Sequence, residues 1–406
     1  MNILFVTHAF PRETGDAAGS FLLQLAKGLG VHGVTVRVLA PAAPGFPRDD
    51  VVDGIFVTRF RYAPAGMETL AYTGTMAEQA RGSVGGLLAM AGLLARGRAA
   101  VRREREQRHP DVVHAHWWFP GGLIARSQSG RTPFVTTLHG TDVRLAAHGG
   151  LGRRLFRFVA RGSDRVTAVS RWLADAAQAA CAGLDVSVAP MPVDVTQLLP
   201  APAGVVRSGV LFVGRLNAQK GVADLIDAFA RSTAPALLDI VGDGPDADGV
   251  RARALELGVG DRVRFHGALP GTALPTLYQH AGVVVLPSRD EGLGLVAVEA
   301  QLCGAPVIAY DSGGLRDVVQ HDRTGLLVPP GERDALTAAI DAVLTTPALA
   351  GRLAEQGRVA ALARFAPAAA AERYIQVYEQ AIAQHAHTAS SARRPGPAAE
   401  VEPDRG

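Results

Sequence analysis

Short apolar runs rich in β-branched residues alternate with helical patterns along most of the chain. In the N-terminal half these runs occupy residues 3–7, 34–40, 55–60, 111–116, 134–138 and 166–169. After a proline-rich stretch, six more runs follow at residues 210–213, 237–241, 263–265, 283–286, 307–309 and 326–328. Apolar runs of this length, separated by helices, are typical of strands in parallel sheets. The pattern predicts an α/β protein with two doubly wound, Rossmann-like domains that face each other across a cleft.

Changes in composition suggest where the domains begin and end. We assign residues 1–190 to the first domain, 191–202 to a proline-containing linker and 203–366 to the second domain. A helical pattern at 367–386 follows, which we expect to pack back on the first domain. The remaining segment, 387–406, is rich in proline, charged and small residues, so we expect it to be a disordered tail.

Composition restricts the class of protein and its compartment. Hydrophobic residues make up 48% of the chain and charged residues 19%, which is typical of a globular protein. Two cysteines are too few for a disulfide framework or a zinc cluster. The first ten residues read as a strand, and the apolar run at 85–95 is closed by Arg96, so we expect neither a signal peptide nor a membrane span. These features favour the cytoplasm.

Positive charge is concentrated in the N-terminal half. Residues 1–200 contain 22 basic and 15 acidic side chains, whereas residues 201–406 contain 19 and 23. Six arginines lie between Arg96 and Arg108, directly after an apolar segment. This segment is either a solvated helix face or a peripheral contact with an anionic membrane, on its inner face if the protein is cytoplasmic. Without interleaved aromatic residues, we do not expect it to bind nucleic acid.

The most specific chemical signal lies in residues 288–310. Open α/β sheets bind ligands beyond the carboxyl ends of their strands, and Glu291, Gly292 and Gly294 follow the run at 283–286. Small residues at the start of a helix let backbone N–H groups approach a phosphate. Glu299 lies in an otherwise apolar helical stretch, where a lone acid is costly to bury, and it could accept hydrogen bonds from a ribose diol. The segment predicts a nucleotide site.

A second signal follows the run at 210–213, in the sequence VLFVGRLNAQKG. Arg215 and Lys220 are placed to clamp a diphosphate and to stabilise the charge that it gains as it leaves. Lys220 is one of only two lysines in the chain, which favours a function over an incidental surface position.

The ordered motifs DVVHAH, TLHGTD, VTAVS, VGRLNAQKG, VGDGP, EGLGLVAVE and TGLLVPPG resemble those of the retaining glycosyltransferases of family 4, which have the GT-B fold. The resemblance implies transfer of a sugar, with retention, from a nucleotide diphosphate sugar to a hydroxyl acceptor. We expect a UDP-sugar as donor and no metal or other cofactor. The first domain would then hold the acceptor and the second the nucleotide sugar.

The resemblance also implies site residues. It suggests four catalytic residues, Arg215, Lys220, Glu291 and His139. It suggests nine donor-binding residues, Gly15, Ala18, Gly19, Gly214, Gly244, Gly292, Leu293, Gly294 and Glu299.

A cluster at the end of the fourth run supplies candidates for the acceptor side. They are His114, His116 and Trp117, together with Asp142 of the TLHGTD motif. The two histidines have the spacing of a metal site, but no cysteine or carboxylate nearby completes one. We therefore expect these side chains either to line the acceptor side or to pack in the core.

Three other functions are alternatives to sugar transfer. A nucleotide-sugar epimerase shares the GT-B architecture, although the glutamate pair and the VGRLNAQKG motif argue against it. An NAD-dependent dehydrogenase would also have two doubly wound domains, but no G-x-G-x-x-G follows the first run. A binding protein without catalytic activity is the third alternative.

Overall fold

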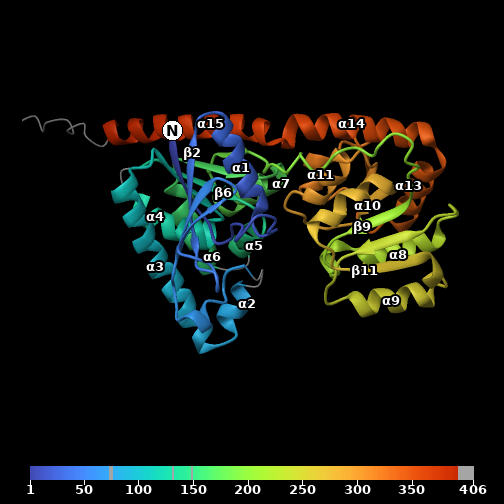
Figure 1. The fold of residues 1–406 in the computed structure, drawn as a ribbon, viewed down its shortest axis with the longest axis horizontal. Coiled ribbons are helices and arrows are strands. Elements are labelled where there is room, and N and C mark those ends of the chain that lie inside the picture. Colours follow the sequence, from blue (N-terminus) through green and yellow to red (C-terminus); the bar gives the residue numbers. More distant parts are fainter. Residues whose placement is uncertain (73–75, 130–131, 148–149, 392–406) are drawn as a thin grey trace, which may run out of the picture.

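The computed structural model describes residues 1–72, 76–129, 132–147 and 150–391. Two α/β domains lie side by side, and two long C-terminal helices run along one edge of both (Figure 1). Most of the tail predicted at 387–406 lies outside the described residues. Its first five residues belong to the last helix, α15 (Pro367–Ser391).

The N-terminal domain is built on an eight-stranded sheet in the order β3-β4-β2-β1-β5-β6-β7-β8. Its strands are β1 (Asn2–Val6), β2 (Thr35–Pro41), β3 (Asp49–Val52), β4 (Ile55–Phe60), β5 (Val112–His116), β6 (Phe134–Leu138), β7 (Arg165–Ala168) and β8 (Val186–Val188). All neighbours are parallel except β3, which pairs antiparallel with β4. The strands β3 and β8 were not predicted, because DDVV carries two carboxylates and VSV has a serine between its two valines.

Helices cover the N-terminal sheet in two groups. Its helices are α1 (Ser20–Val31), α2 (Met76–Arg81), α3 (Val84–Arg108), α4 (Leu123–Ser129), α5 (Thr141–Ala147), α6 (Gly150–Arg161) and α7 (Arg171–Ala180). The helix α1 packs against α15, while α4 packs against both α3 and α6. Figure 1 shows α3 and α4 to the left of the sheet and α1 to its right.

The C-terminal domain has a fully parallel six-stranded sheet in the order β11-β10-β9-β12-β13-β14. Its strands are β9 (Ser208–Val213), β10 (Leu238–Val241), β11 (Val263–Gly267), β12 (Ala281–Leu286), β13 (Val307–Tyr310) and β14 (Leu326–Val328). Its helices are α8 (Val222–Arg231), α9 (Ala247–Glu256), α10 (Leu274–His280), α11 (Leu295–Leu302), α12 (Leu315–Val318), α13 (Arg333–Thr345) and α14 (Pro347–Phe365). The strand order reverses between β9 and β12, and parallel sheets bind their ligands at such a switch point.

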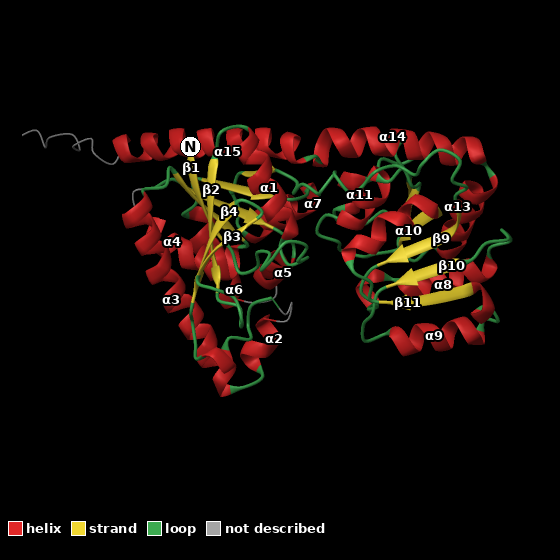
Figure 2. Cartoon of the chain, viewed as in Figure 1, coloured by secondary structure: helices red, strands yellow, loops and turns green. Residues whose placement is uncertain are grey.

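The two C-terminal helices connect the domains along the edge seen in Figure 2. The helix α14 packs on α11 and α13 of the C-terminal domain, and α15 packs on α1 of the N-terminal domain. They are separate helices because Pro367 has no N–H to continue the ladder. Tyr374 and Tyr378 of α15 are fully buried in the N-terminal core. The predicted architecture of two doubly wound domains facing a cleft is thereby confirmed.

Candidate active site

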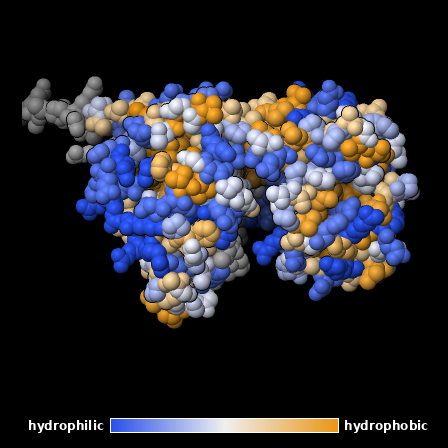
Figure 3. Space-filling view, viewed as in Figure 1, coloured by the Kyte–Doolittle hydropathy of each residue, from blue (hydrophilic) through white to orange (hydrophobic). Residues whose placement is uncertain are grey.

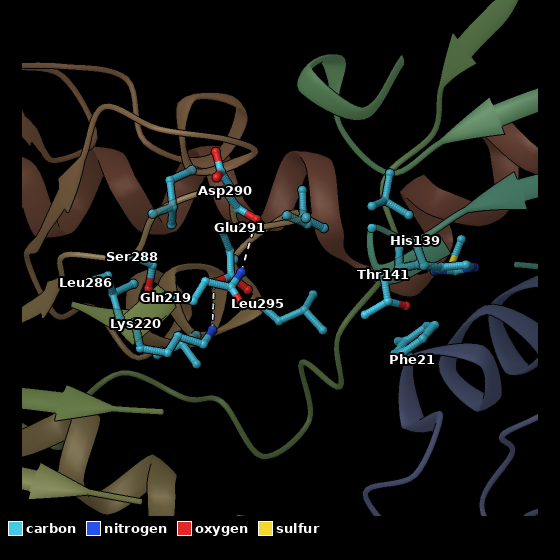
Figure 4. Close-up of a pocket in the computed structure, with 18 of the residues that line it drawn as sticks. Phe21, His139, Thr141, Gln219, Lys220, Leu286, Ser288, Asp290, Glu291 and Leu295 are labelled. Atoms are coloured by element: carbon cyan, nitrogen blue, oxygen red, sulfur yellow. Dashed lines mark hydrogen bonds and ion pairs between the residues drawn. The ribbon is translucent and has the colours of Figure 1, made fainter. Parts of the chain in front are cut away.

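A cavity of about 360 Å³ lies between the two domains, and side chains from both form its walls (Figure 4). The N-terminal wall consists of Phe21, Trp117, His139, Gly140, Thr141, Arg144 and Val169. The C-terminal wall includes Gln219, Lys220, Ser288, Asp290, Glu291, Gly292, Leu293, Gly294, Leu295 and Val296. Most of these residues follow the carboxyl ends of strands, so the cavity lies where the topology places ligands.

Lys220 and Glu291 form the charged centre of the C-terminal wall. Lys220 ends a short 3-10 helix (Ala218–Lys220) after β9, and Glu291 follows β12. The Lys220 Nζ lies 2.6 Å from Glu291 Oε2. The Asn217 side chain accepts a hydrogen bond from the Lys220 backbone N–H at 3.1 Å and so shapes this turn. The ion pair holds the ammonium group in the cavity while a carboxylate balances its charge.

Arg215, the second predicted cation, lies apart from this centre. Its side chain is exposed at the end of β9 and does not line the cavity. Its guanidinium forms no ion pair within the described part of the chain. In this conformation, Lys220 is therefore the one of the two predicted clamp cations that reaches the cavity.

The amino end of α11 points its backbone N–H groups at the same cavity. Gly294 precedes the helix with φ of 92°, a left-handed conformation that glycine adopts without strain. Leu295 and Val296 follow as the first helical residues and line the cavity. Their N–H groups have no acceptor within the helix, and the helix dipole adds partial positive charge. This end of α11 can therefore bind a phosphate.

Glu299 lies on α11, outside the residues that line the cavity. Its carboxylate accepts a hydrogen bond of 2.9 Å from the Tyr278 hydroxyl of α10. Burial raises the pKa of Glu299, and the hydrogen bond from Tyr278 opposes that shift. One carboxylate oxygen is thus held in place, and the predicted ribose contact stays a prediction.

Asp142 lies behind the N-terminal wall of the cavity and fixes the backbone of that wall. Its buried carboxylate accepts backbone N–H groups of His139 at 3.1 Å, Gly140 at 2.9 Å and Trp118 at 3.2 Å. Burial raises its pKa, and these hydrogen bonds oppose the shift. Predicted as an acceptor-side residue, Asp142 instead holds together the two loops that carry Trp117 and His139.

His116 supports His139 from the core. The His116 Nδ1 lies 3.3 Å from His139 Nε2, and the His116 ring is fully buried. Burial, more than the neighbouring imidazoles, lowers the pKa of both rings well below the usual value. Both are therefore neutral near pH 7, so at this contact one ring donates its N–H to the ring nitrogen of the other.

His114 packs in the core, the second of the two alternatives, and does not line the cavity. It is fully buried, with Nδ1 2.9 Å from the Tyr378 hydroxyl and Nε2 2.7 Å from the Thr137 hydroxyl. Burial lowers its pKa to about 3. His114 faces inward because alternate residues of β5 point to opposite faces, and its face is covered by α15. Of the four predicted acceptor-side residues, Trp117 alone lines the cavity.

Several predicted donor-binding residues also lie outside the cavity walls, namely Gly15, Ala18, Gly19, Gly214 and Gly244. At two of these glycines, close packing accounts for the residue type. A Cβ on Gly19 would lie 2.5 Å from the Ala9 carbonyl oxygen, and one on Gly244 would lie 2.2 Å from that of Leu216. In the sequence, a glycine that close packing of a loop requires looks the same as a glycine of a phosphate-binding loop.

The cavity also includes residues that the sequence did not name individually as site residues. Phe21, Thr141, Arg144, Gln219 and Ser288 all line it. Thr141 and Arg144 follow β6 and Ser288 follows β12, so their position after a strand was the available signal. Phe21 gave no such signal, because it reaches the cavity from α1.

Within the described ranges, no three His, Cys, Asp or Glu side chains are grouped so that they could hold a metal ion.

Family models and solved structures identify relatives of both domains. Residues 18–197 match the model described as "Glycosyltransferase Family 4", and residues 207–360 match "Glycosyl transferases group 1". Among solved structures, sucrose-phosphate synthase from Thermosynechococcus elongatus superimposes with a TM-score of 0.74 at 23% identity, over 94% of this chain and 99% of that one. Anabaena HepE in complex with UDP superimposes with a TM-score of 0.70 at 22% identity, over 93% and 100%.

Three curated relatives match at higher identity. A glycogen synthase from Mycobacterium tuberculosis is 31% identical over 88% of this chain and 89% of that protein. A 2-deoxystreptamine N-acetyl-D-glucosaminyltransferase from Streptomyces fradiae is 33% identical, covering 82% and 85%. A D-inositol 3-phosphate glycosyltransferase from Salinispora tropica is 31% identical, covering 92% and 83%. With these matches over nearly its full length, the chain belongs to glycosyltransferase family 4 and has the GT-B fold.

Proposed function

We propose that this glycosyltransferase moves a sugar from a UDP-sugar to a hydroxyl group of its acceptor, with retention of configuration and without a metal ion. The observation that carries the proposal is the arrangement across the cavity. Lys220 and the amino end of α11 face His139 and Trp117 of the other domain. A diphosphate on the first wall would place the donor sugar at the second. The structural likeness to HepE, which was solved with UDP, supports the choice of nucleotide.

Each wall has its own part in this proposal. Lys220 and the free N–H groups of α11 would stabilise the negative charge that develops on the departing diphosphate. His139, held by Asp142 and His116, would face the donor sugar. Glu291 is engaged by Lys220, so the pair would orient the ammonium toward the phosphate. Retention through the donor's own phosphate needs no side-chain base.

For the acceptor we propose a six-membered polyhydroxylated ring, a cyclitol or a pyranose. Trp117 offers an aromatic surface in the cavity, and its ring centroid lies 4.2 Å from that of His139. The C–H face of such a ring can pack on an aromatic surface while its hydroxyls stay free to react. The names of two of the relatives contain a cyclitol, which supports this class.

The location of the protein in the cytoplasm stays a prediction.

A donor-by-acceptor panel tests the proposal. The purified protein is incubated with UDP-, GDP- and ADP-sugars and with glycogen, inositol, inositol phosphate and 2-deoxystreptamine. Products are identified by mass spectrometry, and their anomeric configuration by NMR. We expect a retained glycoside from a UDP donor that still forms when EDTA is present. An inverted product, or turnover that EDTA abolishes, would contradict the proposed mechanism.

A further inference from the structure

The helix α3 exposes an apolar strip on the surface of the N-terminal domain. Val84 is 75% exposed, Leu87 57% and Leu88 63%. Small apolar residues continue the exposed side through Ala91, Ala95 and Ala99. The opposite side is the one that packs inward, with buried residues four positions apart at Ala89, Leu93, Gly97 and Val101. Half of this helix therefore presents apolar side chains to the outside.

The helix α3 is both long and apolar. Within the described residues, it is the one helix long and apolar enough to cross a membrane. Only 22% of its most apolar 18-residue stretch is buried. The sequence predicted no such segment, because Arg96 closes the apolar run. In the structure, α3 packs along α4 at the surface of a folded domain. This packing favours a helix that lies on a membrane over one that crosses it.

Arginines follow the apolar strip on the same helix. Arg96, Arg102, Arg103 and Arg108 are exposed, and Glu106 beside them pairs with Arg102 at 2.8 Å. A helix that rests in the interfacial layer of a bilayer typically combines an apolar surface with basic residues that reach the headgroups. The exposed part of α3 has both components.

The helix α6 repeats this combination. Leu151, Arg154, Phe158 and Arg161 lie at helical spacing on its outer side, with Leu151 72% exposed and Phe158 50% exposed. The helix contains no acidic residue. Arg153, Arg154 and Arg161 form no ion pair with any described residue.

Between α4 and α6 lies a hollow of about 330 Å³, lined by Arg126, Arg154, Arg157, Phe158, Arg161 and Gly162. The Arg126 guanidinium stacks over the Phe158 ring, 5.2 Å from its centroid. The lining contains four arginines and no acidic residue, which creates a positive potential suited to a phosphate group.

The three helices form one continuous surface, because α4 contacts both α3 and α6. Figure 3 shows the strongly hydrophilic left side of the N-terminal domain and the apolar tip below it, where α3 begins. A soluble polyanion would need the arginines but not the exposed Leu87, Leu88, Leu151 and Phe158. A bilayer interface accommodates apolar groups and binds cations at nearly the same depth.

We propose that the outer surface of α3, α4 and α6 docks the N-terminal domain on an anionic lipid bilayer. The C-terminal domain has no part in this contact and stays free to move over the nucleotide. The proposal is independent of the donor and the acceptor, because binding to lipid is measured without turnover.

Co-sedimentation of the full chain with vesicles tests the docking. Vesicles of phosphatidylcholine alone are compared with vesicles containing phosphatidylglycerol, at about 0.1 M and about 1 M salt, where the Debye length falls from about 10 Å to about 3 Å. We expect binding to the anionic vesicles that weakens at high salt. Equal binding to both vesicles, or no binding at low salt, would overturn the proposal.

Two double variants test the basic and the apolar residues of this surface separately. Arg154→Ser with Arg161→Ser should lower the partition coefficient about thirtyfold, from the loss of two surface cations. Leu87→Ser with Leu88→Ser should lower it about tenfold or more. The matched control is Leu255→Ser with Arg264→Ser, at exposed positions of the C-terminal domain. Circular dichroism and free UDP binding verify that each variant is folded.

Other outcomes of this experiment reject the membrane as partner. If the control pair lowers binding as much as the test pairs, the attraction is not located on this surface. If light scattering shows a dimer that Leu87→Ser with Leu88→Ser dissociates, the apolar strip is a contact between two copies of the chain, and the proposal is wrong.

Discussion

At the scale of single residues, the cavity brings together groups that are far apart in the sequence. Lys220 and Glu291 are 71 positions apart and form an ion pair, and His116 contacts His139 across two neighbouring strands. The type of each residue was informative by itself, because a rare lysine after a strand and an acid in an apolar helix both need a reason. The sequence did not show which atoms meet, because a contact distance depends on the positions of both partners.

Lys220→Ala tests the diphosphate contact. The ammonium acts most strongly on charge that develops in the transition state, so kcat should fall by about 10²- to 10³-fold. Steady-state kinetics with the donor identified by the panel provide the measurement. The matched control is Lys27→Ala at the other lysine, an exposed residue near Asp53, which should keep normal kinetics. A folded Lys220→Ala protein with unchanged kcat/KM would remove Lys220 from the site.

Glu299→Gln tests the ribose contact. The amide keeps the shape of the side chain but loses the charge, and hydrogen bonds to a charged acceptor exceed neutral ones by about 1 to 2 kcal/mol. We expect UDP to bind about tenfold more weakly in titration calorimetry. Glu355→Gln, at an exposed position of α14, serves as control. If UDP binds Glu299→Gln and the parent equally, Glu299 does not bind the ribose.

At the scale of elements, α15 explains why a histidine on β5 is not part of the site. The sequence predicted that this helix packs back on the N-terminal domain, but not which strand or side chains it covers. In the structure, Tyr378 meets His114 and the Tyr374 hydroxyl donates to the Ala189 carbonyl oxygen at 3.0 Å. An H-x-H motif after a strand looks the same in sequence whether the next layer is solvent or a helix.

The buried His114 predicts a pH dependence of stability. Its folded pKa of about 3 lies below that of an unfolded histidine, about 6.5. Between these values the unfolded chain binds the additional proton, so stability decreases as the pH falls from 6.5 toward 3. Each such histidine contributes a slope of about 1.4 kcal/mol per pH unit. His114→Gln should remove about that much from the slope.

Urea denaturation at several pH values measures this slope. All three tryptophans, Trp117, Trp118 and Trp172, lie in the N-terminal domain, so their fluorescence reports its unfolding. His32→Gln, at an exposed position of the same domain, is expected to keep the parent slope. An identical slope in His114→Gln would show that His114 is not the group that resists protonation.

At the scale of the whole molecule, the two domains meet by backbone contacts next to the cavity. A Cβ on Gly292 would lie 2.7 Å from the His139 carbonyl oxygen. The Arg171 backbone N–H donates to Asp317 Oδ2 at 2.7 Å, which joins α7 to α12. Beside the linker, the Val193 backbone N–H donates to the Phe365 carbonyl oxygen at 3.0 Å. The width of the cavity therefore depends on how closely these surfaces approach.

Gly292→Ala should hold the domains further apart. The added methyl group requires the His139 loop to move away, and a misplacement of about 1 Å can cost about a hundredfold in rate. We expect kcat/KM for the donor to fall about tenfold to a hundredfold, and small-angle scattering with UDP to show a larger radius of gyration. Gly249→Ala on α9, where a Cβ meets nothing within 4 Å, is the control. Unchanged scattering and kinetics would show that this contact does not limit closure.

The sequence by itself was sufficient for the fold class, the family and the loops that carry the chemistry. Strand and helix periodicity, glycines at helix starts and the order of short motifs are local properties, and local properties can be read along the chain. Lys220, Glu291 and His139 were found in this way, and all three line the cavity.

Only the tertiary structure decided which candidates meet. It placed His114 under α15, set Asp142 behind the His139 loop and left Arg215 exposed, outside the cavity walls. It also showed that the apolar part of α3 faces outward. Burial and contact depend on elements that are distant in sequence and come together only when both domains fold, so no local pattern contains that information.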